Sequence, residues 1–454
     1  MDVVLLSRIQ YALTSMFHYI YPPLSIGLGL MLVIIEGMYV RTKNPHYKMI
    51  AKFWVKVFGL TFALGVATGL VQLFGFGTNW SRYSRFIGDV FGSALGAEGV
   101  FAFFLEAGFL GVMMFGWDRV SVRFHYLSTI LVSLGSHFSA VWIVVANSWM
   151  QTPAGFKIIS DGVETKAVVT DLWQMIFNPS SVDRLVHVIL GCWLAGIFLV
   201  ISVSAYYFLK GKHLPFAKTG IKFGLISSSI VLVLQLISAD STAEGVAKHQ
   251  PAKLAAMEGV YKTEPYTPLY AFGWVDADAQ EVHGLKIPGL LSFLTYKDAS
   301  KPVPGLDTIP RDEWPNVPLV FQAYHMMIAM WGSMVFATAL GLYVFYKGKI
   351  DKAKWILRLL VLSVIFPQLA NQCGWVTAEA GRQPWLVYKL LRTSEGISAN
   401  IKASQVAGSI TMFVVIYILL FCLFTFLLDR KIKHGPSDDS DSSGSDVYTN
   451  PFKE

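Results

Sequence analysis

Six side chains that can ligate iron or carry protons lie in strongly apolar stretches of this sequence. They are His18 in SMFHYIYPP, Glu98 in LGAEGVF, Glu106 in FFLEAGF, His187 in DRLVHVI, Met327 in YHMMIAM and Glu379 in VTAEAGRQPW. Ionisable groups are costly inside a membrane, so each is a candidate functional residue. Histidine and methionine are the iron ligands of electron-transfer haems, and a weak carboxylate ligand or an open site suits a haem that handles oxygen. These residue types predict haem chemistry if they converge.

The composition places these residues in a membrane protein. Of the 454 residues, 54% are hydrophobic and only 15% are charged, whereas soluble domains carry about 25% charged residues. A helix needs roughly 20 apolar residues to cross a bilayer, and β-barrel alternation is not visible. We therefore predict an all-α polytopic membrane bundle of about nine transmembrane helices. The nine segments lie near 14–40, 52–77, 93–116, 124–147, 185–209, 217–238, 318–346, 355–378 and 404–428.

The basic residues indicate the orientation of the bundle. They concentrate in the short loops after predicted helices one, three, five, seven and nine. Because basic loops stay on the cytoplasmic side, we expect the N-terminus outside and the C-terminus in the cytoplasm. The net charge of +7 is thereby explained by topology, and no nucleic-acid partner is expected. The first helix is expected to be retained, since no basic leader or cleavage site precedes it.

This topology brings the candidate residues to a common depth. His18, His187 and Met327 fall near the outer starts of helices one, five and seven, and Glu379 falls at the outer end of helix eight. Two further carboxylates share helix three. Glu98 lies near its outer start, and Glu106 lies eight residues further in, about 12 Å deeper and about 80° around a regular helix.

Each candidate also has a simpler explanation. A lone membrane histidine often bridges helices by a hydrogen bond, and an early-helix methionine is usually core. Glu98 or Glu379 alone could be an interfacial carboxylate that faces water. His125, His137 and His325 are similar in type, and we assign them no ligand role from the pattern. The shared depth favours a functional set over six unrelated residues.

A secondary transporter is the competing class of protein. Charged residues would then line a substrate path, and the chain would contain discontinuous half-helices and inverted internal symmetry. Neither is visible in the sequence. A transporter would be colourless, so a visible spectrum separates the two classes.

The remaining features concern domain organisation and cysteines. We divide the chain into a membrane domain at 1–433, which contains an outer polar loop at 239–317, and a disordered tail at 434–454. Cys192, Cys373 and Cys422 lie within or at the ends of apolar segments. Their number and placement exclude a disulfide framework, and C-x-x-C-H is absent. We expect each to be a small buried hydrophobic residue.

Several stretches together resemble subunit I of the cytochrome bd-type quinol oxidases over residues 1 to about 430. They are QYALTSMFHYIYPPLSIGL, FALGVATGLVQLFGFGTNW, GAEGVFAFFLEAGFLG, VWIVVANSWMQTP, KLAAMEG and WVTAEAGRQPW. The glutamate before GRQPW is the most specific of these motifs. The resemblance implies three haems in this subunit: a low-spin haem b, a high-spin haem b, and a haem d that a haem b can replace.

The resemblance also implies residue roles. His187 and Met327 match the axial pair of the low-spin haem b. His18 and Glu379 match the axial ligands of the other two haems, in an order that is left open. Glu98 matches a carboxylate beside these two haems, either a ligand or a proton relay.

Three more residues receive roles in this way. Glu106 matches the acid that leads protons towards the haems. Lys253 and Glu258 match quinol-site residues of the family's outer "Q loop", away from the ligand-bearing helices. The sequence pattern alone would make these two an ordinary solvated charge pair.

The segment after Glu379 has a physical explanation of its own. Arg382 suits haem propionates, because a guanidinium stays charged and binds carboxylates bidentately. Gly381 permits close backbone approach, and Pro384 can stop the helix. An interfacial anchor made of Arg382 and Trp385 is the alternative.

The chain departs from the best-known members in two places. Its outer loop is short, which leaves the quinone type open. His325 stands where many members have an arginine, so a different haem potential and a minor alternative ligand role for His325 stay open.

The resemblance implies a terminal oxidase of the bacterial cytoplasmic membrane. Quinol is oxidised at the outer face, and dioxygen is reduced to water with cytoplasmic protons. Charge separation then generates a proton motive force without pumping. A second membrane subunit is implied as partner, with a small single-helix subunit as a further one.

Overall fold

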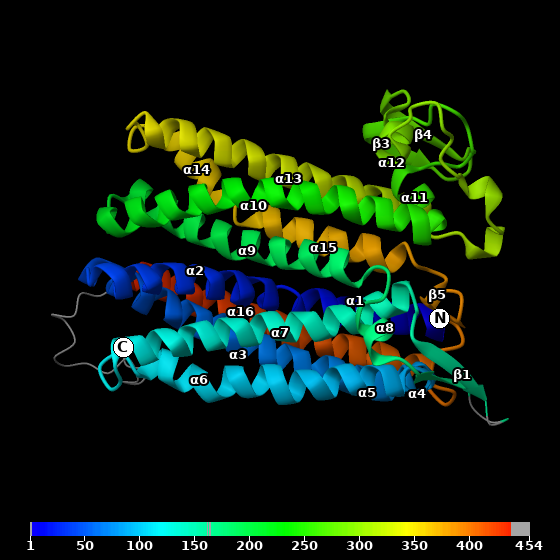
Figure 1. Cartoon of the computed structure of the whole chain (residues 1–454), viewed down its shortest axis with the longest axis horizontal. Coiled ribbons are helices and arrows are strands. Elements are labelled where there is room, and N and C mark those ends of the chain that lie inside the picture. Colours follow the sequence, from blue (N-terminus) through cyan, green and yellow to red (C-terminus); the bar gives the residue numbers. More distant parts are fainter. Residues whose placement is uncertain (1, 161, 163–164, 437–454) are drawn as a thin grey trace.

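The chain forms a bundle of long helices that run along one common axis (Figure 1). The computed structural model describes residues 2–160, 162 and 165–436. In this described part, nine helical stretches are long and apolar enough to cross a membrane, which confirms the predicted number. They are Val3–Thr42, Pro45–Thr78, Gly88–Phe115, Val122–Gln151, Ser181–Lys210, Leu214–His249, Val317–Tyr346, Lys354–Ala380 and Ala403–His434.

Three of these spans are interrupted, and six are single helices. The first joins α1 (Val3–His18) to α2 (Tyr21–Thr42), where Pro22 and Pro23 open the second helix. The third joins α5 (Gly88–Ala97), a π-helix η1 (Glu98–Phe103) and α6 (Phe104–Phe115). The eighth joins α14 (Lys354–Leu362) to α15 (Ile365–Ala380). The single helices are α3 (Pro45–Thr78), α7 (Val122–Gln151), α9 (Ser181–Lys210), α10 (Leu214–His249), α13 (Val317–Tyr346) and α16 (Ala403–His434).

The π-helix corrects one expectation. We predicted a regular helix through Glu98 and Glu106 and an angle of about 80° between them. A π-turn contains more residues than an α-turn, so each residue turns by less than 100° and that angle does not hold. Single π segments inside α-helices are frequent at functional sites.

Short helices and three antiparallel hairpins complete the fold. The short helices are α4 (Ser81–Phe86), α8 (Leu172–Ile176), α11 (Pro251–Glu258), α12 (Leu290–Tyr296), η2 (Leu306–Thr308) and η3 (Arg311–Glu313). The hairpins pair β1 (Phe156–Ser160) with β2 (Thr165–Val169), β3 (Leu269–Asp276) with β4 (Glu281–Ile287), and β5 (Trp385–Val387) with β6 (Leu391–Arg392). The first begins with Phe156 opposite Val169, and the second with Leu269 opposite Ile287.

The hairpins gather at one end of the bundle. Figure 1 shows β1, β3, β4 and β5, with α11 and α12, at the end where the N-terminus lies. Helix α10 continues to His249, so the non-helical part of the outer loop starts later than residue 239. Lys297 of the loop holds the last turns of α10 in place, because its ammonium lies 3.5 Å from Asp240 and 3.0 Å from Glu244.

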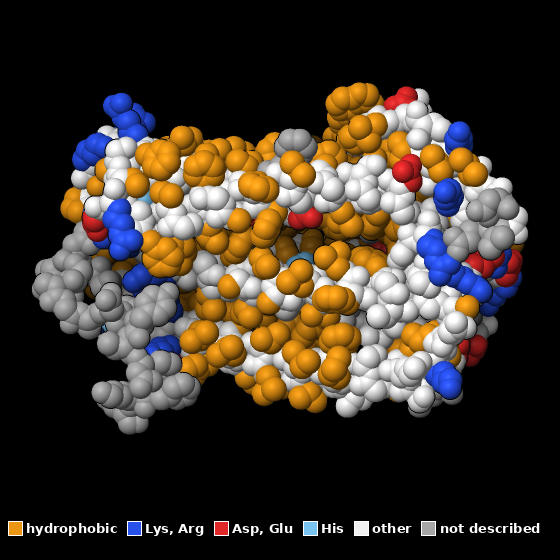
Figure 2. Space-filling view, turned by 90° about the horizontal axis from the view of Figure 1, so that it is seen from below, with side chains coloured by type: hydrophobic (Ala, Val, Ile, Leu, Met, Phe, Trp, Pro, Cys, Tyr) orange, Lys and Arg blue, Asp and Glu red, His pale blue; other side chains and the backbone are white. Residues whose placement is uncertain are grey.

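The bundle presents a hydrophobic belt to its surroundings. In Figure 2, hydrophobic side chains cover the middle of the molecule and charged ones gather at both ends. Helix α16 illustrates this, since Ile418, Leu419 and Phe426 are exposed. All three cysteines are unpaired; Cys192 is buried and Cys373 is half-buried, but Cys422 on α16 is exposed. The expectation of burial is therefore wrong for Cys422, because its helix faces outward. The predicted disordered tail lies outside the described residues from 437 onward.

Close helix packing holds the centre of the bundle together. Gly27 on α2 meets Gly196 on α9 so tightly that a Cβ added to Gly27 would lie 2.6 Å from the Gly196 nitrogen. Small residues permit such approaches in membranes, where van der Waals packing is a main driving force.

We expect Gly27→Ala to destabilise the protein by about 1–3 kcal/mol, the usual cost of overpacking. Its thermal midpoint, measured on the detergent-solubilised protein, should fall. Gly408→Ala is the matched control, because a Cβ there meets nothing within 4 Å. Equal midpoints for Gly27→Ala and the unaltered protein would contradict this account of the packing.

Candidate functional site

Glu379 lies near the C-terminal end of α15 in a cage of hydrogen-bond donors. The Asn147 amide donates to its Oε1 at 2.9 Å, and the Gln151 amide donates to the same atom at 3.4 Å. Both donors stand on α7, one turn apart. The Arg382 guanidinium binds Oε2. Glu379 is therefore a fixed carboxylate rather than a freely solvated interfacial residue.

Positive charge exceeds negative charge around this carboxylate. Arg184 of α9 donates to the Asn147 side-chain oxygen, and the Lys253 ammonium of α11 donates to Gln151 and, at 2.6 Å, to Gln250. Three cations thus surround one anion. Burial, followed by the nearby Arg184 and Arg382, holds the pKa of Lys253 well below its ordinary value.

Several guanidinium nitrogens of this cluster point at no acceptor. Within the described residues, Nε and one terminal nitrogen of Arg382, and Nε of Arg184, are buried without a hydrogen-bond partner. Buried unpaired cations are strongly unfavourable. The donor set therefore fits a further anionic group, such as a haem propionate, which two guanidinium groups bind well.

His187 and Met327 lie on either side of one stretch of α15. The Gln235 amide lies 3.1 Å from both ring nitrogens of His187. One turn along α9, Gly191 accepts a hydrogen bond from Asn371 of α15. Three residues further along α15, a Cβ added to Gly374 would lie 2.9 Å from the Met327 sulfur. These contacts bring the two predicted axial ligands to the same level of the bundle.

His18 lies at the break between α1 and α2. Its Nδ1 is 2.9 Å from the Thr68 hydroxyl, which orients the ring. A Cβ added to Gly69 would lie 3.1 Å from its Cε1, so only glycine leaves room beside the imidazole. A hydrogen bond to one ring nitrogen fixes the ring and leaves the other nitrogen available to a metal.

Glu98 and Glu106 both contact α7. The Ser139 hydroxyl donates to Glu98 Oε1 at 2.8 Å, and Ser136 is a hydrogen-bond partner of the buried Glu106. A Cβ added to Gly135 would lie 2.6 Å from Glu106 Cγ. The helix that holds Glu379 therefore also holds these two carboxylates.

The two residues predicted for quinol are buried, not solvated. Lys253 is 3% exposed and Glu258 is 2% exposed. Burial raises the pKa of Glu258 to about 7, although a hydrogen bond from Tyr324 opposes the rise. Lys253 belongs to the Glu379 cluster, so the expectation that it lies away from the ligand-bearing helices is wrong. The reason is that α11 folds back onto Gly381, whose added Cβ would lie 2.9 Å from Lys253 Cγ.

His325 has a structural role. Its Nδ1 and Nε2 lie 2.9 Å from the carbonyl oxygens of Phe321 and Tyr270, and its ring stacks on Phe321 at 3.8 Å. The Nε2 contact joins β3 to α13, and the Nδ1 contact stays within α13. This geometry does not favour the alternative ligand role.

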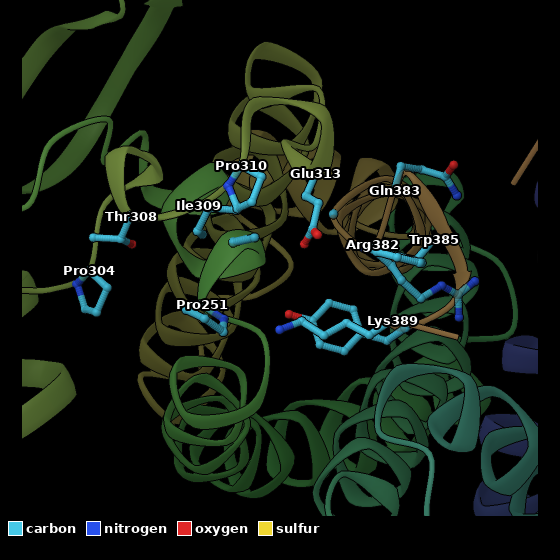
Figure 3. A pocket seen from close by; sticks show the side chains of 13 residues that line it. Pro251, Pro304, Thr308, Ile309, Pro310, Glu313, Arg382, Gln383, Trp385 and Lys389 are labelled. Carbon is cyan, nitrogen blue, oxygen red and sulfur yellow. The ribbon is translucent and has the colours of Figure 1, made fainter. Parts of the chain in front are cut away.

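A pocket of about 260 Å³ opens beside the Glu379 cluster. Figure 3 shows Pro251, Glu313, Arg382 and Lys389 around it, with the Glu313 carboxylate facing its interior. Arg382 therefore forms a wall between the buried carboxylate and this outer pocket.

Sequence reasoning missed four residues of the site. They are Asn147, Gln151, Arg184 and Tyr324. Asn147 and Gln151 stand in VWIVVANSWMQTP, a stretch that carried the resemblance, and Arg184 precedes His187 by three residues. For Arg184 and Tyr324, each three residues before a candidate ligand, that position within one helical turn was the usable signal.

The donor set fits haem better than a free metal ion. In the described part of the chain, no three His, Cys, Asp or Glu side chains converge as metal ligands. Haem iron needs only one or two axial protein ligands, and single candidates on separate helices meet that need. Figure 2 also shows a hollow in one face of the bundle, with acidic and histidine side chains visible among hydrophobic ones.

Sequence comparison decides the family. The profile of cytochrome bd terminal oxidase subunit I matches residues 6–436. This chain belongs to that family. Among its relatives, cytochrome bd ubiquinol oxidase subunit 1 of Bacillus subtilis is 37% identical, over 100% of this chain and 98% of the relative. Cytochrome bd-II ubiquinol oxidase subunit 1 of Escherichia coli is 34% identical, over 96% and 97%.

The fold of this bd oxidase subunit agrees with a solved relative. The bd oxidase from Geobacillus thermodenitrificans superposes with a TM-score of 0.87 and 31% identity, covering 96% of this chain and 99% of that one. The predicted family and helical membrane fold are confirmed. The interrupted spans, which a transporter would also show, therefore belong to an oxidase architecture.

Proposed function

We propose that this chain is the haem-bearing subunit of a quinol-oxidising terminal oxidase. Two quinols are oxidised to quinones, and their four electrons reduce one dioxygen to two waters. The observation that carries this proposal is the buried Glu379 cluster, whose excess of cations and unpartnered guanidinium nitrogens suits haem propionates. A visible spectrum with pyridine haemochrome analysis tests it, since a colourless protein would contradict it and the spectrum also shows whether haem d is present.

Haem supplies the redox-active iron in this proposal. His187 and Met327 would hold a low-spin haem b. His18 and Glu379 would each hold one of the two other haems, which are a high-spin haem b and a haem d that a haem b can replace. Glu98 lies beside these two as a ligand or a relay. Arg382 and Arg184 would donate to propionates.

Quinol would be oxidised at the end of the bundle that contains α11. Glu258 can accept a quinol proton, because a carboxylate with its pKa near 7 changes protonation state easily at neutral pH. Lys253, on the same short helix, links this region to the Glu379 cluster through Gln151. Electrons would thus pass from the α11 region to the haems over a short path.

Protons for water would come from the opposite end. Glu106 lies deeper than Glu98 along the third span, and Ser136 and Ser139 connect both to α7. With the N-terminal end outside, quinol protons leave on the outer side and water-forming protons arrive from the cytoplasm. This arrangement separates charge across the bacterial cytoplasmic membrane without a pump.

The assembly and the quinone complete the proposal. A second membrane subunit, a small single-helix subunit and membrane lipid would cover parts of the hydrophobic belt. The substrate is a ubiquinol or a menaquinol, the two quinols named for relatives of this chain.

Met327→Leu should preserve the fold and abolish the low-spin character of one haem b. Leucine fills a similar volume but has no sulfur to bind iron. The measurement is the reduced α-band and its midpoint potential. Met326→Leu is the matched control, since Met326 is 47% exposed and should leave both unchanged. An unaltered low-spin band in Met327→Leu would exclude Met327 as the ligand, and His187→Ala should lose that haem altogether.

Glu258→Gln should slow quinol oxidation while leaving haem content intact. In the unaltered protein, quinol oxidation should rise with pH through about 7, because the protonated carboxyl cannot accept a proton and the carboxylate can. That rise should vanish in Glu258→Gln, while an artificial donor that bypasses quinol should still support oxygen reduction. Glu264→Gln, at an exposed position, should keep the rise. Retention of the pH dependence in Glu258→Gln would assign it to another group.

Glu106→Gln should severely slow oxygen reduction and leave quinol-driven reduction of the low-spin haem fast. The amide keeps the hydrogen-bonding outline but cannot relay protons by ionising. Glu106→Asp should be partly active. Single-turnover kinetics with proton-uptake measurements from the inner side check this, and unaltered uptake in Glu106→Gln would remove Glu106 from the path.

A further inference from the structure

A second buried acid–base pair lies on α7, away from the Glu379 cluster. Glu36 of α2 is 0% exposed and His125 of α7 is 2% exposed. His125 Nδ1 lies 2.7 Å from Glu36 Oε1, and the Thr129 hydroxyl donates to Glu36 Oε2 at 2.6 Å. Both carboxylate oxygens are therefore bound by α7.

One nitrogen of this pair has no hydrogen-bond partner. His125 Nε2 is buried and, among the described residues, unpartnered. A buried polar atom normally has a partner or a water. This nitrogen can take up or release a proton without breaking the bond to Glu36.

The pair lies one aromatic layer below a charged surface. The Trp117 ring lies against His125 in a tilted arrangement, with their centroids 3.9 Å apart, and the Lys52 ammonium lies 6.0 Å from the Trp117 ring centre. Beyond it, Asp118 lies 3.0 Å from Lys48 and 3.7 Å from Lys52. On the remaining side, a Cβ added to Gly37 would lie 2.8 Å from the Tyr126 hydroxyl. This surface belongs to the end of the bundle opposite the Glu379 cluster.

A line of hydroxyl groups connects the pair to Glu106. Thr129, Ser133 and Ser136 follow one another at intervals of four and three residues, which places them on one face of α7. The steps are about 4.5–6 Å along the helix, a gap that one water can bridge. Ser133 faces α2, where a Cβ added to Gly29 would lie 3.1 Å from its hydroxyl oxygen.

The same face continues to the oxygen-site carboxylates. Ser136 bonds Glu106, and Ser139 bonds Glu98. Glu36 lies on α2, and Glu98 and Glu106 lie on the third span, yet each of the three is bound by a hydroxyl of α7. They form one series of three carboxylates along a single helix.

We propose that Glu36 and His125 form a proton-loading site that feeds Glu106 along α7. This inference rests on the proposed function, in which protons reach the oxygen site from the end opposite the Glu379 cluster. Glu36 and His125 are positioned to relay protons and touch no reacting atom.

The proton balance of one cycle is simple. A proton from water binds His125 Nε2, and the Nδ1 proton passes to Glu36 Oε1, so the pair changes from one net negative charge to neutral. Glu36 rotates its acid proton to the Thr129 side and releases it, while Thr129 passes its own hydroxyl proton towards Ser133. The pair returns to one net negative charge with the imidazole proton now on Nε2, and a flip of the ring turns that N–H to Glu36 and opens the bare nitrogen to the next proton. No electrons are exchanged.

A purely structural bond between α2 and α7 is the competing explanation, because interhelical hydrogen bonds of this kind stabilise membrane bundles. The two explanations predict different effects of the variants. A structural bond affects stability and haem retention, whereas a loading site affects proton uptake per haem.

The experiment uses the complete oxidase in vesicles, with single-turnover oxygen reduction and a pH-sensitive dye inside. Glu36→Gln and Thr129→Val should each slow proton uptake at least about tenfold, a barrier increase of about 1.4 kcal/mol. Haem spectra and quinol-driven haem reduction should be unchanged, and Glu36→Asp should be partly active. His46→Gln is the matched control, because it breaks a similar His–Thr contact of 2.8 Å with Thr219 away from this face of α7.

Infrared difference spectroscopy gives a readout that is independent of turnover. The unaltered protein should show a protonated carboxyl band that changes with pH and is absent from Glu36→Gln. Wild-type proton uptake in Glu36→Gln and Thr129→Val would overturn the proposal. Loss of stability or haem with normal uptake per remaining haem would also overturn it and assign a structural bond. An unaltered enzyme that reduces no oxygen would instead refute the proposed function.

Discussion

The end of the bundle where the N-terminus lies depends on one buried carboxylate with more positive than negative charge around it. Glu379 is held by Arg382 and by two amides of α7, while Arg184 and Lys253 approach through those amides. Burying three cations with one anion is unfavourable unless further negative charge is supplied. This constraint explains why four separate elements, α7, α9, α11 and α15, converge there. A bound anion would complete the fold of this region as well as its chemistry.

Helix α7 is the common partner of the buried acids. It supplies hydroxyl groups to Glu36, Glu98 and Glu106 and amides to Glu379. A single straight helix can set the depth of four carboxylates, because its residues rise by a constant step. The acids themselves come from the other helices that pack on it. In the proposed function, this one element would coordinate oxygen chemistry and proton supply.

The sequence predicted the parts that depend on local patterns. Long apolar runs identified the nine spans, and polar residues within those runs identified His18, Glu106 and Glu379. The burial of Lys253 and Glu258 was not predictable, because the chain folds α11 back onto Gly381 through contacts that are distant in sequence. A loop with polar composition looks solvated until its tertiary contacts are known.

Two further misses have the same origin. The π-helix at 98–103 leaves no mark in hydrophobic periodicity, so Glu98 and Glu106 were placed on a regular helix. Cys422 was expected to be buried because its segment is apolar, yet apolar residues in a membrane protein also face outward. In both cases the packing of the helix against its neighbours, rather than the sequence of the helix itself, decides its geometry or the burial of its side chains.

The π-helix gives the third span a fixed length. It accommodates an additional residue between α5 and α6 while the helix remains continuous. Deleting a single residue inside the π-helix would restore a regular α-helix with both sides still in phase. Deleting Phe104 or Leu105 of α6 would instead turn Glu106 by about 100° relative to Glu98, and the two carboxylates could then no longer both reach the hydroxyl groups of Ser139 and Ser136. Natural variants of this oxidase should therefore tolerate substitutions between Gly88 and Phe115 far better than a change in residue number outside the π-helix.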